Sequence, residues 1–222
     1  VELAKTVVET IEKNEANFAP IYDEKLPIKE KLNIIAKEIY RADGVIFTLR
    51  DIGFYEEIEE NGSTLEENSK IKANVIWQWL ISCGMEKEYD GIFADDTGLE
   101  IDALGGQPGV YSARWAGEPS NDANNRKKAL AMLINTHHRN ARFRTVITWI
   151  NKKSTIQVDG IVEGSIAYEE VGSGGFGYDA IFIPEGYNET FATLSQEVKN
   201  NISHRARALV ALRNAIDNLI LV

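Results

Sequence analysis

The order of helical and extended patterns along this chain restricts its fold more than any other feature of the sequence. Residues 1–40 look helical and charged, and helical patterns occur over 29–40, 63–81, 122–134 and from Ser203 onward. Stretches typical of strands lie between these helices, at 45–49, 91–94, 99–104, 143–150, 155–167 and 178–183. Because the elements intermix without regular alternation, we expect an α/β fold with a mixed sheet flanked by helices. No repeat or Pro/Ser-rich linker divides residues 1–222, which predicts a single domain.

Charge and composition exclude several classes of partner. The formal net charge of −10 argues against a nucleic-acid-binding surface, although locally concentrated cations would still accept an anionic substrate. No apolar run is long enough to span a bilayer, and no secretory signal pattern is present. Cys83 is the single cysteine, so no internal disulfide can form, and its apolar neighbours favour a buried core thiol. We therefore expect a cytoplasmic protein that binds neither nucleic acid nor membrane.

The sequence Asp95-Asp96-Thr97-Gly98 directly follows the apolar stretch 91–94. Adjacent carboxylates at the end of a strand can hold a hard divalent cation through oxygen. The glycine would let the backbone approach a phosphate closely. The same residues are also typical of an acidic turn, and the pattern alone favours neither interpretation.

A second cluster interleaves glycines with two aromatic residues over 173–179. A strand rather than a helix is expected after it, so it is not a dinucleotide-binding fingerprint. Phe176 and Tyr178 would suit stacking on a base whose edge is bound by main-chain groups. The alternative, a hairpin with both rings in the core, is favoured by the pattern alone.

The third cluster covers 199–205 and is rich in cations. Ser203 is a predicted N-cap, which puts His204 and Arg205 in the first helical turn, where each cation costs roughly 0.3–1 kcal/mol against the helix dipole. A bound anion would offset this cost. Lys199 adds a single positive charge, and the guanidinium of Arg205 can make two parallel hydrogen bonds to one anion. The pattern therefore favours an anion-binding site over a solvated surface segment.

A fourth feature is the acidic run 56–60, which precedes a turn and the helix that carries Lys72. One of its glutamates would complete a metal site, but the pattern does not say which. Together the four clusters offer a metal site, a phosphate site and a base site, which a metal-assisted hydrolase of nucleoside polyphosphates needs. A phosphate-binding P-loop motif is absent from the sequence.

Four long motifs carry a family resemblance. They cover 93–99, 106–117, 175–179 and 199–205, in that order. Through them the chain, from about 51 to 216, resembles the inosine triphosphate pyrophosphatase family, also called Ham1-like or non-standard purine NTP pyrophosphatases. The resemblance implies an elongated fold of two lobes with a central cleft, and usually a homodimer. It also implies Mg²⁺-dependent hydrolysis of ITP, dITP and XTP to nucleoside monophosphate and pyrophosphate.

The resemblance also assigns roles to residues. Asp96 matches the proton acceptor that helps to hold Mg²⁺, Glu60 matches the second acid on the metal side, and Lys72 matches a catalytic lysine close to the phosphates. We expect Lys199 to assist Lys72 there, and the base to sit beside Phe176 and Tyr178. The matched substrate contacts are Thr97, Phe176, Gly177, Tyr178, Asp179, Lys199, His204 and Arg205.

The start of the chain departs from the family pattern. Family members usually begin with a strand and a Ser/Thr-x-Asn-x-x-Lys loop, whereas 20–25 keeps only the lysine, Lys25, with Lys29 in an alternative register. Residues 1–17 read as an N-terminal extension. Two other functions are weaker interpretations: a Maf-like nucleotide pyrophosphatase and a non-catalytic nucleotide-binding protein. The Ser-His-Arg helix start at 203–205 and the loop 176–179 argue against the first. The retained residues Asp95, Asp96, Lys72 and Lys199 argue against the second.

Overall fold

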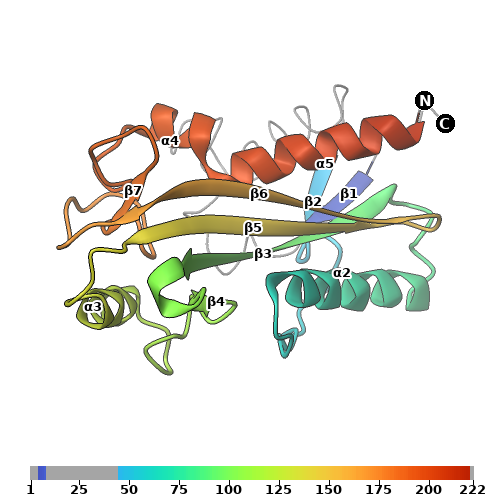
Figure 1. Ribbon diagram of the computed structural model, residues 1–222. Coiled ribbons are helices and arrows are strands. Elements are labelled where there is room, and N and C mark those ends of the chain that lie inside the picture. The colour runs from blue at the N-terminus through green and yellow to red at the C-terminus, as the bar shows by residue number, and fades with distance from the viewer. Residues whose placement is uncertain (1–4, 9–44, 221–222) are drawn as a thin grey trace.

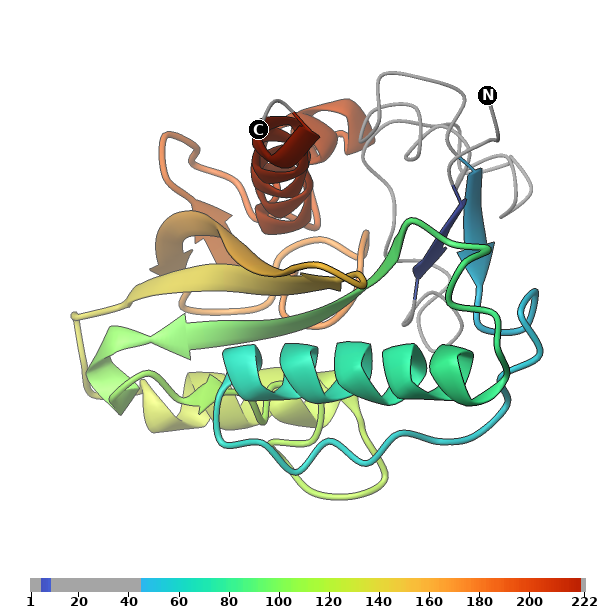
Figure 2. The ribbon, with the colours of Figure 1, turned by 90° about the vertical axis from the view of Figure 1, so that its right-hand side faces the viewer.

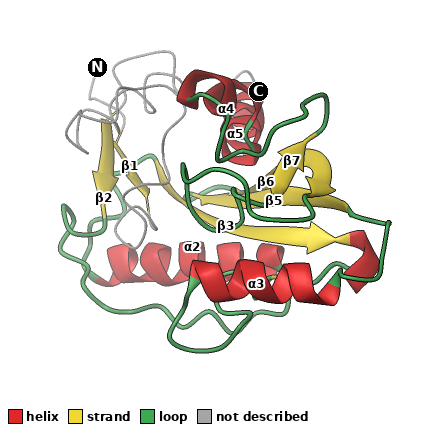
Figure 3. Cartoon of the chain, turned by 90° about the vertical axis from the view of Figure 1, so that its left-hand side faces the viewer, coloured by secondary structure: helices red, strands yellow, loops and turns green. Residues whose placement is uncertain are grey.

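The computed structural model describes residues 5–8 and 45–220. The helix expected over 29–40 and the candidate contact Lys25 lie outside these residues. The described chain forms three layers with a mixed sheet in the middle (Figure 1). Helices α4 (Gln196–Ile202) and α5 (His204–Ile220) lie over one face, and α2 (Leu65–Ser82) and α3 (Asp122–Met132) lie over the other (Figures 1 and 3). The predicted α/β architecture is confirmed.

The sheet contains seven strands in the order β2-β1-β3-β5-β6-β7, and the short β4 pairs with β3. Strand β1 is parallel to its neighbours β2 and β3, and all the other pairs are antiparallel. The strands are β1 (Lys5–Val8), β2 (Val45–Thr48), β3 (Gly91–Ile101), β4 (Pro108–Gly109), β5 (Asn140–Ile150), β6 (Thr155–Ile166) and β7 (Phe182–Pro184). A three-residue 3-10 helix, Asp102–Leu104, follows β3. The sheet is therefore mixed, as expected.

Several predicted elements differ from the structure. Lys5–Val8 is a strand between β2 and β3 rather than part of a helical extension, so these residues of the predicted extension 1–17 belong to the central sheet (Figure 2). A strand of four residues is too short for periodicity to separate it from a helix. The strand expected at 178–183 is β7, Phe182–Pro184, and turns precede it. Helix α4 had no predicted counterpart.

Strand β3 is the largest correction. The sequence predicts two strands, 91–94 and 99–104, whereas the structure has one continuous strand of 11 residues. It stays extended because every residue from Ile92 to Ile101 pairs with β5. On the other edge β1 pairs only as far as Phe93, and β4 pairs only with Leu99 and Glu100. Among the described strands, 94–98 therefore has one free edge in the middle of the sheet.

Two hydrophobic cores lie at opposite ends of the long strands. One core contains Ala94 together with Ile52, Phe54, Ala73, Ile76, Trp77, Leu80, Ile92 and Ile150. The other contains Leu99 together with Ile101, Ala129, Leu133, Ala141, Phe143, Val162, Ile166, Tyr178, Ile181, Phe182 and Phe191. The polar residues of β3 between Ala94 and Leu99 thus fall between the two cores. This arrangement matches the expected two lobes with a cleft between them.

Two smaller expectations concern solvent and membrane. Cys83 ends α2 as its C-cap and is exposed, so the prediction of a buried core thiol is wrong. The buried face of α2 ends at Leu80, one turn earlier. Within residues 5–8 and 45–220, the helices are too short or too polar to cross a membrane.

Candidate active site

A cleft of about 470 Å³ opens where β3 has its free edge. It brings together residues from α2, β3, the loop after β4, the start of α5 and the segment 173–179, called here the glycine–aromatic loop. The predicted site residues that line it are Glu60, Lys72, Asp96, Thr97, Phe176, Gly177, Tyr178, Asp179, His204 and Arg205. The acidic strand and the basic helix start therefore face the same cavity, which has the size of a small-molecule site.

Asp95 and Asp96 point to opposite faces of the sheet because side chains alternate along a strand. Asp96 faces α2, where its Oδ1 accepts a hydrogen bond from Lys72 Nζ at 3.1 Å. Asp95 faces α5, where its Oδ2 lies 3.4 Å from Arg205 Nε. The expectation that the two adjacent carboxylates share one cation is therefore wrong, because they belong to different faces of β3.

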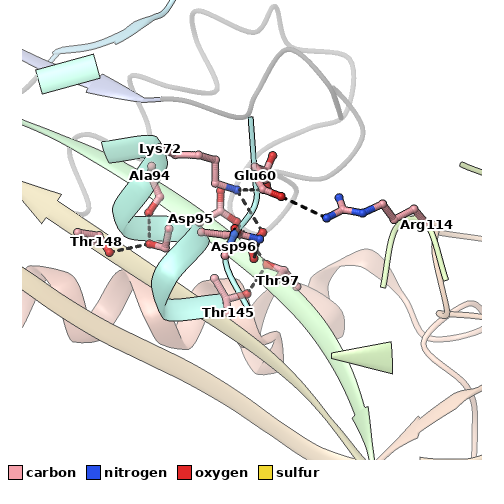
Figure 4. Close-up of polar contacts among 12 residues, drawn as sticks. Glu60, Lys72, Ala94, Asp95, Asp96, Thr97, Arg114, Thr145 and Thr148 are labelled. Carbon is pink, nitrogen blue, oxygen red and sulfur yellow. Dashed lines mark hydrogen bonds and ion pairs between the residues drawn. The ribbon is translucent and has the colours of Figure 1, made fainter. Parts of the chain in front are cut away.

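The partner of Asp96 at the acidic end of the cleft is Glu60. Lys72 Nζ donates to Glu60 Oε2 and to Asp96 Oδ1, both at 3.1 Å, and so joins the two carboxylates (Figure 4). Asn68 Nδ2 donates to Asp96 Oδ2 at 3.4 Å, and Asn68 Oδ1 accepts from Gly62 N at 2.8 Å. The segment before α2 and the helix itself thus converge on the side chain of Asp96.

Local contacts in α2 explain the position of Lys72. Thr64 caps the helix, since its Oγ1 accepts from Glu67 N at 3.1 Å. Ser69 Oγ donates to Ala94 O at 2.9 Å and lies 2.8 Å from Thr148 Oγ1, which fixes α2 on β3 and β5 (Figure 4). Lys72 lies one turn further along the same face and is only 3% exposed.

Burial and charge shift both groups of the Lys72–Asp96 pair. Burial raises the pKa of Asp96 to about 6, because loss of water and repulsion by Glu60 outweigh the attraction of Lys72. Burial alone would lower the pKa of Lys72, but the carboxylates of Asp96, Asp95 and Glu60 raise it above its ordinary value. Lys72 is therefore a permanent cation, and Asp96 is a carboxylate with the affinity for protons that a general base needs.

The acidic end of the cleft fits a hard divalent cation such as Mg²⁺. Glu60 and Asp96 supply carboxylate oxygens toward one point, which Lys72 Nζ occupies in this structure. Within residues 5–8 and 45–220, the acids, histidines and cysteine form no metal-holding group of three or more. Mg²⁺ typically uses one or two carboxylates and completes its shell with substrate phosphates and water. The donor set thus suits a cation that arrives with a polyphosphate.

The two residues that follow Asp96 have different roles. Thr97 Oγ1 lies 2.8 Å from Thr145 Oγ1 and 3.3 Å from Asp95 Oδ2, so its hydroxyl is fixed at the cleft wall (Figure 4). A Cβ atom on Gly98 would come within 2.5 Å of Gly109 O. This glycine is therefore needed for the close approach of β4.

Phe176 lines the cleft near the start of α5, and two cations lie close to its ring. Lys199 Nζ lies 5.8 Å and Arg205 Cζ 5.9 Å from the centre of its ring. Lys199 Nζ donates to Asp179 Oδ2 at 2.7 Å, and the same oxygen accepts from Phe176 N at 3.1 Å. The charge of Lys199 is thus paired with buried Asp179 beside the aromatic ring, and not with the carboxylates that Lys72 joins.

Tyr178 and Gly177 differ from their expected roles. The ring of Tyr178 is 4% exposed within the hydrophobic core, and its hydroxyl donates to Ser112 O at 2.9 Å. It is therefore not a free stacking surface, whereas Phe176 is only half-buried and lines the cleft. The main-chain N–H of Gly177 donates to Asp122 and its carbonyl accepts from Arg126. The N–H is therefore already used within the protein, and the carbonyl already accepts one hydrogen bond.

The start of α5 carries one cation rather than two. Ser203 caps the helix as predicted, since its Oγ accepts from Ala206 N at 3.2 Å. His204 is 7% exposed and stacks on Phe143, with ring centres 4.8 Å apart. Burial, followed by the charges of Arg205 and Lys199, lowers the pKa of His204 well below its usual value, so the imidazole is neutral. Its Nδ1 is buried and lacks a hydrogen-bond partner among the described residues.

Arg114 is a cleft residue to which the sequence analysis assigned no role. One of its guanidinium nitrogens, Nη2, donates to Glu60 O at 3.3 Å (Figure 4). In the part of the chain that the structure describes, it forms no ion pair. Its guanidinium is therefore available for an anion at the acidic end of the cleft. The signal was an arginine inside one of the four family motifs, 106–117.

Comparison with known proteins identifies the family. Residues 28–215 match the sequence model of the Ham1 family. The chain belongs to the Ham1 family. This membership confirms the resemblance carried by the four motifs.

Relatives within the Ham1 family include named enzymes. A dITP/XTP pyrophosphatase of Flavobacterium psychrophilum is 48% identical over 174 residues, which cover 78% of this chain and 87% of the relative. A dITP/XTP pyrophosphatase of Porphyromonas gingivalis is 47% identical over 186 residues, which cover 83% and 91%. Among solved structures, the Ham1 protein of Staphylococcus aureus is 34% identical with a TM-score of 0.78, and the match covers 97% of this chain and 99% of that one. The fold and the family therefore agree.

Proposed function

We propose that this protein hydrolyses non-standard purine nucleoside triphosphates, namely ITP, dITP and XTP, to nucleoside monophosphate and pyrophosphate. The cleft supports this activity because it joins a carboxylate–lysine cluster at one end to an aromatic ring flanked by cations at the other. A nucleotide with its phosphates at Lys72 and its base at Phe176 would bridge the two. The relatives named dITP/XTP pyrophosphatase act on substrates of this class.

At the phosphate end, Asp96 is the proposed proton acceptor. Its carboxylate takes a proton from the water that attacks the α-phosphorus, and Lys72 holds this carboxylate in place. Lys72 and Arg114 stabilise negative charge on the phosphate oxygens. A bound Mg²⁺, held by Asp96 and Glu60, would supply further charge neutralisation for the departing pyrophosphate. Thr97 also lines the cleft, and its hydroxyl lies on the face of β3 that carries Asp95.

At the base end, Phe176 is the proposed stacking surface. Lys199, Arg205 and His204 surround this ring or line the same wall, and they supply donors for a 6-oxo group. An adenine 6-amino group would instead face donors that it cannot satisfy. Such a mismatch disfavours ATP strongly, since a site built for one hydrogen-bonding pattern rejects the other.

A substrate panel tests the proposed function. With Mg²⁺ present, kcat/KM for pyrophosphate release from ITP and XTP is expected to exceed that for ATP by about 10⁴-fold, because of the mismatch at the 6-position. GTP, dTTP and UTP complete the panel, and the Asp96→Asn protein, purified in the same way, measures contaminating phosphatase. Equal rates on ITP, XTP, GTP and ATP would contradict the proposed selectivity, and preferential hydrolysis of dTTP or UTP would favour a Maf-like activity.

A second prediction concerns Arg114. Replacement by alanine is expected to raise KM for ITP about tenfold with a smaller change in kcat, because a charge-assisted contact to the phosphates is lost. Arg114→Lys keeps the charge but not the fork, so its KM should be intermediate. Arg142→Ala is the matched control, since Arg142 pairs with Glu163, Asp102 and Glu100 outside the cleft. An unchanged KM in Arg114→Ala would remove Arg114 from the phosphate site.

A further inference from the structure

Helix α3 holds the backbone of both loops that line the cleft. Asp122, Asn125 and Arg126 share one face of this helix, because they are spaced three and four residues apart. Their side chains bond to main-chain groups of the loop at 112–116 and of the glycine–aromatic loop. Both loops carry cleft-lining residues, Arg114 in the first and Phe176 in the second. One short helix therefore sets the position of two parts of the site.

Gly177 is held from both sides. Asp122 Oδ2 accepts a hydrogen bond from Gly177 N at 2.7 Å, and Arg126 Nη1 donates to Gly177 O at 2.8 Å. Arg126 Nε also donates to Glu170 Oε2 at 3.0 Å, which keeps the guanidinium oriented. Both bonds to Gly177 are charge-assisted and short. Gly177 has a φ of 55°, a left-handed conformation that favours glycine, so the loop is fixed in a turn of defined shape.

The first loop is held by a buried amide. Asn125 is 1% exposed, its Oδ1 accepts from Ala116 N at 2.7 Å, and its Nδ2 donates to Ser112 O at 3.2 Å and Ala113 O at 2.9 Å. The hydroxyl of Tyr178 donates to the same Ser112 carbonyl at 2.9 Å. The two loops are thus tied to each other as well as to α3.

The two hydrogen bonds that hold Gly177 affect the base end of the cleft directly. Phe176 precedes Gly177, and Asp179, which pairs with Lys199, follows two residues later. A change at Gly177 would therefore move the stacking ring relative to Lys199 and Arg205. The cluster of Lys72, Glu60 and Asp96 lies on α2, the segment before it and β3, and among the described residues no hydrogen bond or ion pair joins these side chains to α3. Loss of these hydrogen bonds should therefore weaken base binding more than phosphate binding.

We propose that Asp122 and Arg126 are positioning residues for base recognition, acting through the backbone of Gly177. This proposal rests on the proposed function, because it assigns Phe176 to the purine. Asp122 and Arg126 stiffen the loop before the substrate arrives, so less conformational entropy is lost when the base binds. Neither residue needs to touch the substrate.

Calorimetric binding of two probes tests this role. Inosine monophosphate reports on the base end, and pyrophosphate with Mg²⁺ reports on the phosphate end. Asp122→Ala and Arg126→Met are each expected to weaken binding of inosine monophosphate about tenfold, as for loss of one charge-assisted bond, and to leave pyrophosphate binding within about twofold. Asp122→Asn keeps an acceptor oxygen and should restore most of the binding. Lys127→Met, an exposed cation on the same helix, is the matched control.

The pattern of losses separates positioning from a general effect on the fold. Asp122 and Arg126 hold the same residue, so the double variant should lose less than the sum of the single losses. Equal weakening of both probes, or a Lys127→Met loss as large as that of Arg126→Met, would overturn the proposal. Should Asp122→Ala fail to fold, Arg126→Met, which leaves the helix start intact, decides the question by the same two probes.

The proposed function can fail without this inference, and the reverse also holds. A wild-type protein that binds inosine monophosphate but does not hydrolyse ITP would contradict the function, while an Asp122-dependent affinity for the probe would still support positioning. If the wild-type protein hydrolyses ITP, and Asp122→Ala and Arg126→Met keep its selectivity for ITP over ATP, only the positioning role is refuted. No binding of inosine monophosphate by the wild-type protein would also refute it.

Discussion

Replacing Asp96 by asparagine is expected to lower kcat for ITP hydrolysis by about 10³-fold, the usual contribution of a general base. The amide has nearly the shape of the carboxylate but cannot accept the proton of the attacking water. The fold should persist, because burial raises the pKa of Asp96 to about 6, so the ionised form already bears a desolvation cost that the neutral amide avoids. Steady-state pyrophosphate release at saturating ITP measures the rate, and thermal unfolding measures the fold.

The control for this variant lies on the same strand. Glu100→Gln makes the same change from carboxylate to amide in β3, but Glu100 is outside the cleft and lies 3.8 Å from Arg142. Its turnover should match that of the wild-type protein. If Asp96→Asn keeps a wild-type kcat, Asp96 is not the proton acceptor, and a different group must activate the water.

The sequence predicted those parts of the site that depend on local patterns. The N-cap Ser203 follows from side-chain chemistry within four residues, and it is present in the structure. The acidic and basic clusters are far apart in the sequence, so local patterns do not show that they meet. The family resemblance implied that they line one cleft, and the fold shows it.

The parts that were mispredicted depend on long-range pairing. Polar residues in the middle of β3 look like a turn, but pairing of β3 with β5 along its whole length keeps them extended. The alternation of a continuous strand then separates Asp95 from Asp96, which a turn would not do. Strand β1 is likewise defined by its neighbours, since its four residues carry too little pattern of their own.

Burial explains the remaining differences at the base end. An aromatic beside a glycine has the same pattern whether it lines a cleft or a core, and Tyr178 belongs to the core. His204 reads as a cation in sequence, but its stacking on Phe143 excludes water and leaves it neutral. The hydrogen bonds that join Gly177 to Asp122 and to Arg126 span 55 and 51 positions of the chain, and only the tertiary structure shows them.

Lys72→Met is expected to lower the free energy of unfolding by about 3 kcal/mol as well as turnover, since removing one member of a buried ion pair leaves an uncompensated charge. Lys72 is almost fully buried between Glu60 and Asp96, and methionine of similar length fills its space without a charge. Two acids then face each other without a cation. Urea unfolding in the presence of a chelator measures the loss, and Lys152→Met, at an exposed position, is the control.

Added Mg²⁺ should recover part of this lost stability. In the wild-type protein the ammonium group of Lys72 already pairs with an oxygen of both Glu60 and Asp96, so Mg²⁺ without nucleotide has less to gain there. In Lys72→Met the same carboxylates are unpaired oxygen ligands, which favour a hard divalent cation. Mg²⁺ should therefore stabilise the variant more than the wild-type protein, because a cation that binds only the folded state shifts unfolding by mass action. An equal shift in both proteins would show that Glu60 and Asp96 do not form a cation site, and the divalent cation would then have to bind elsewhere in the cleft.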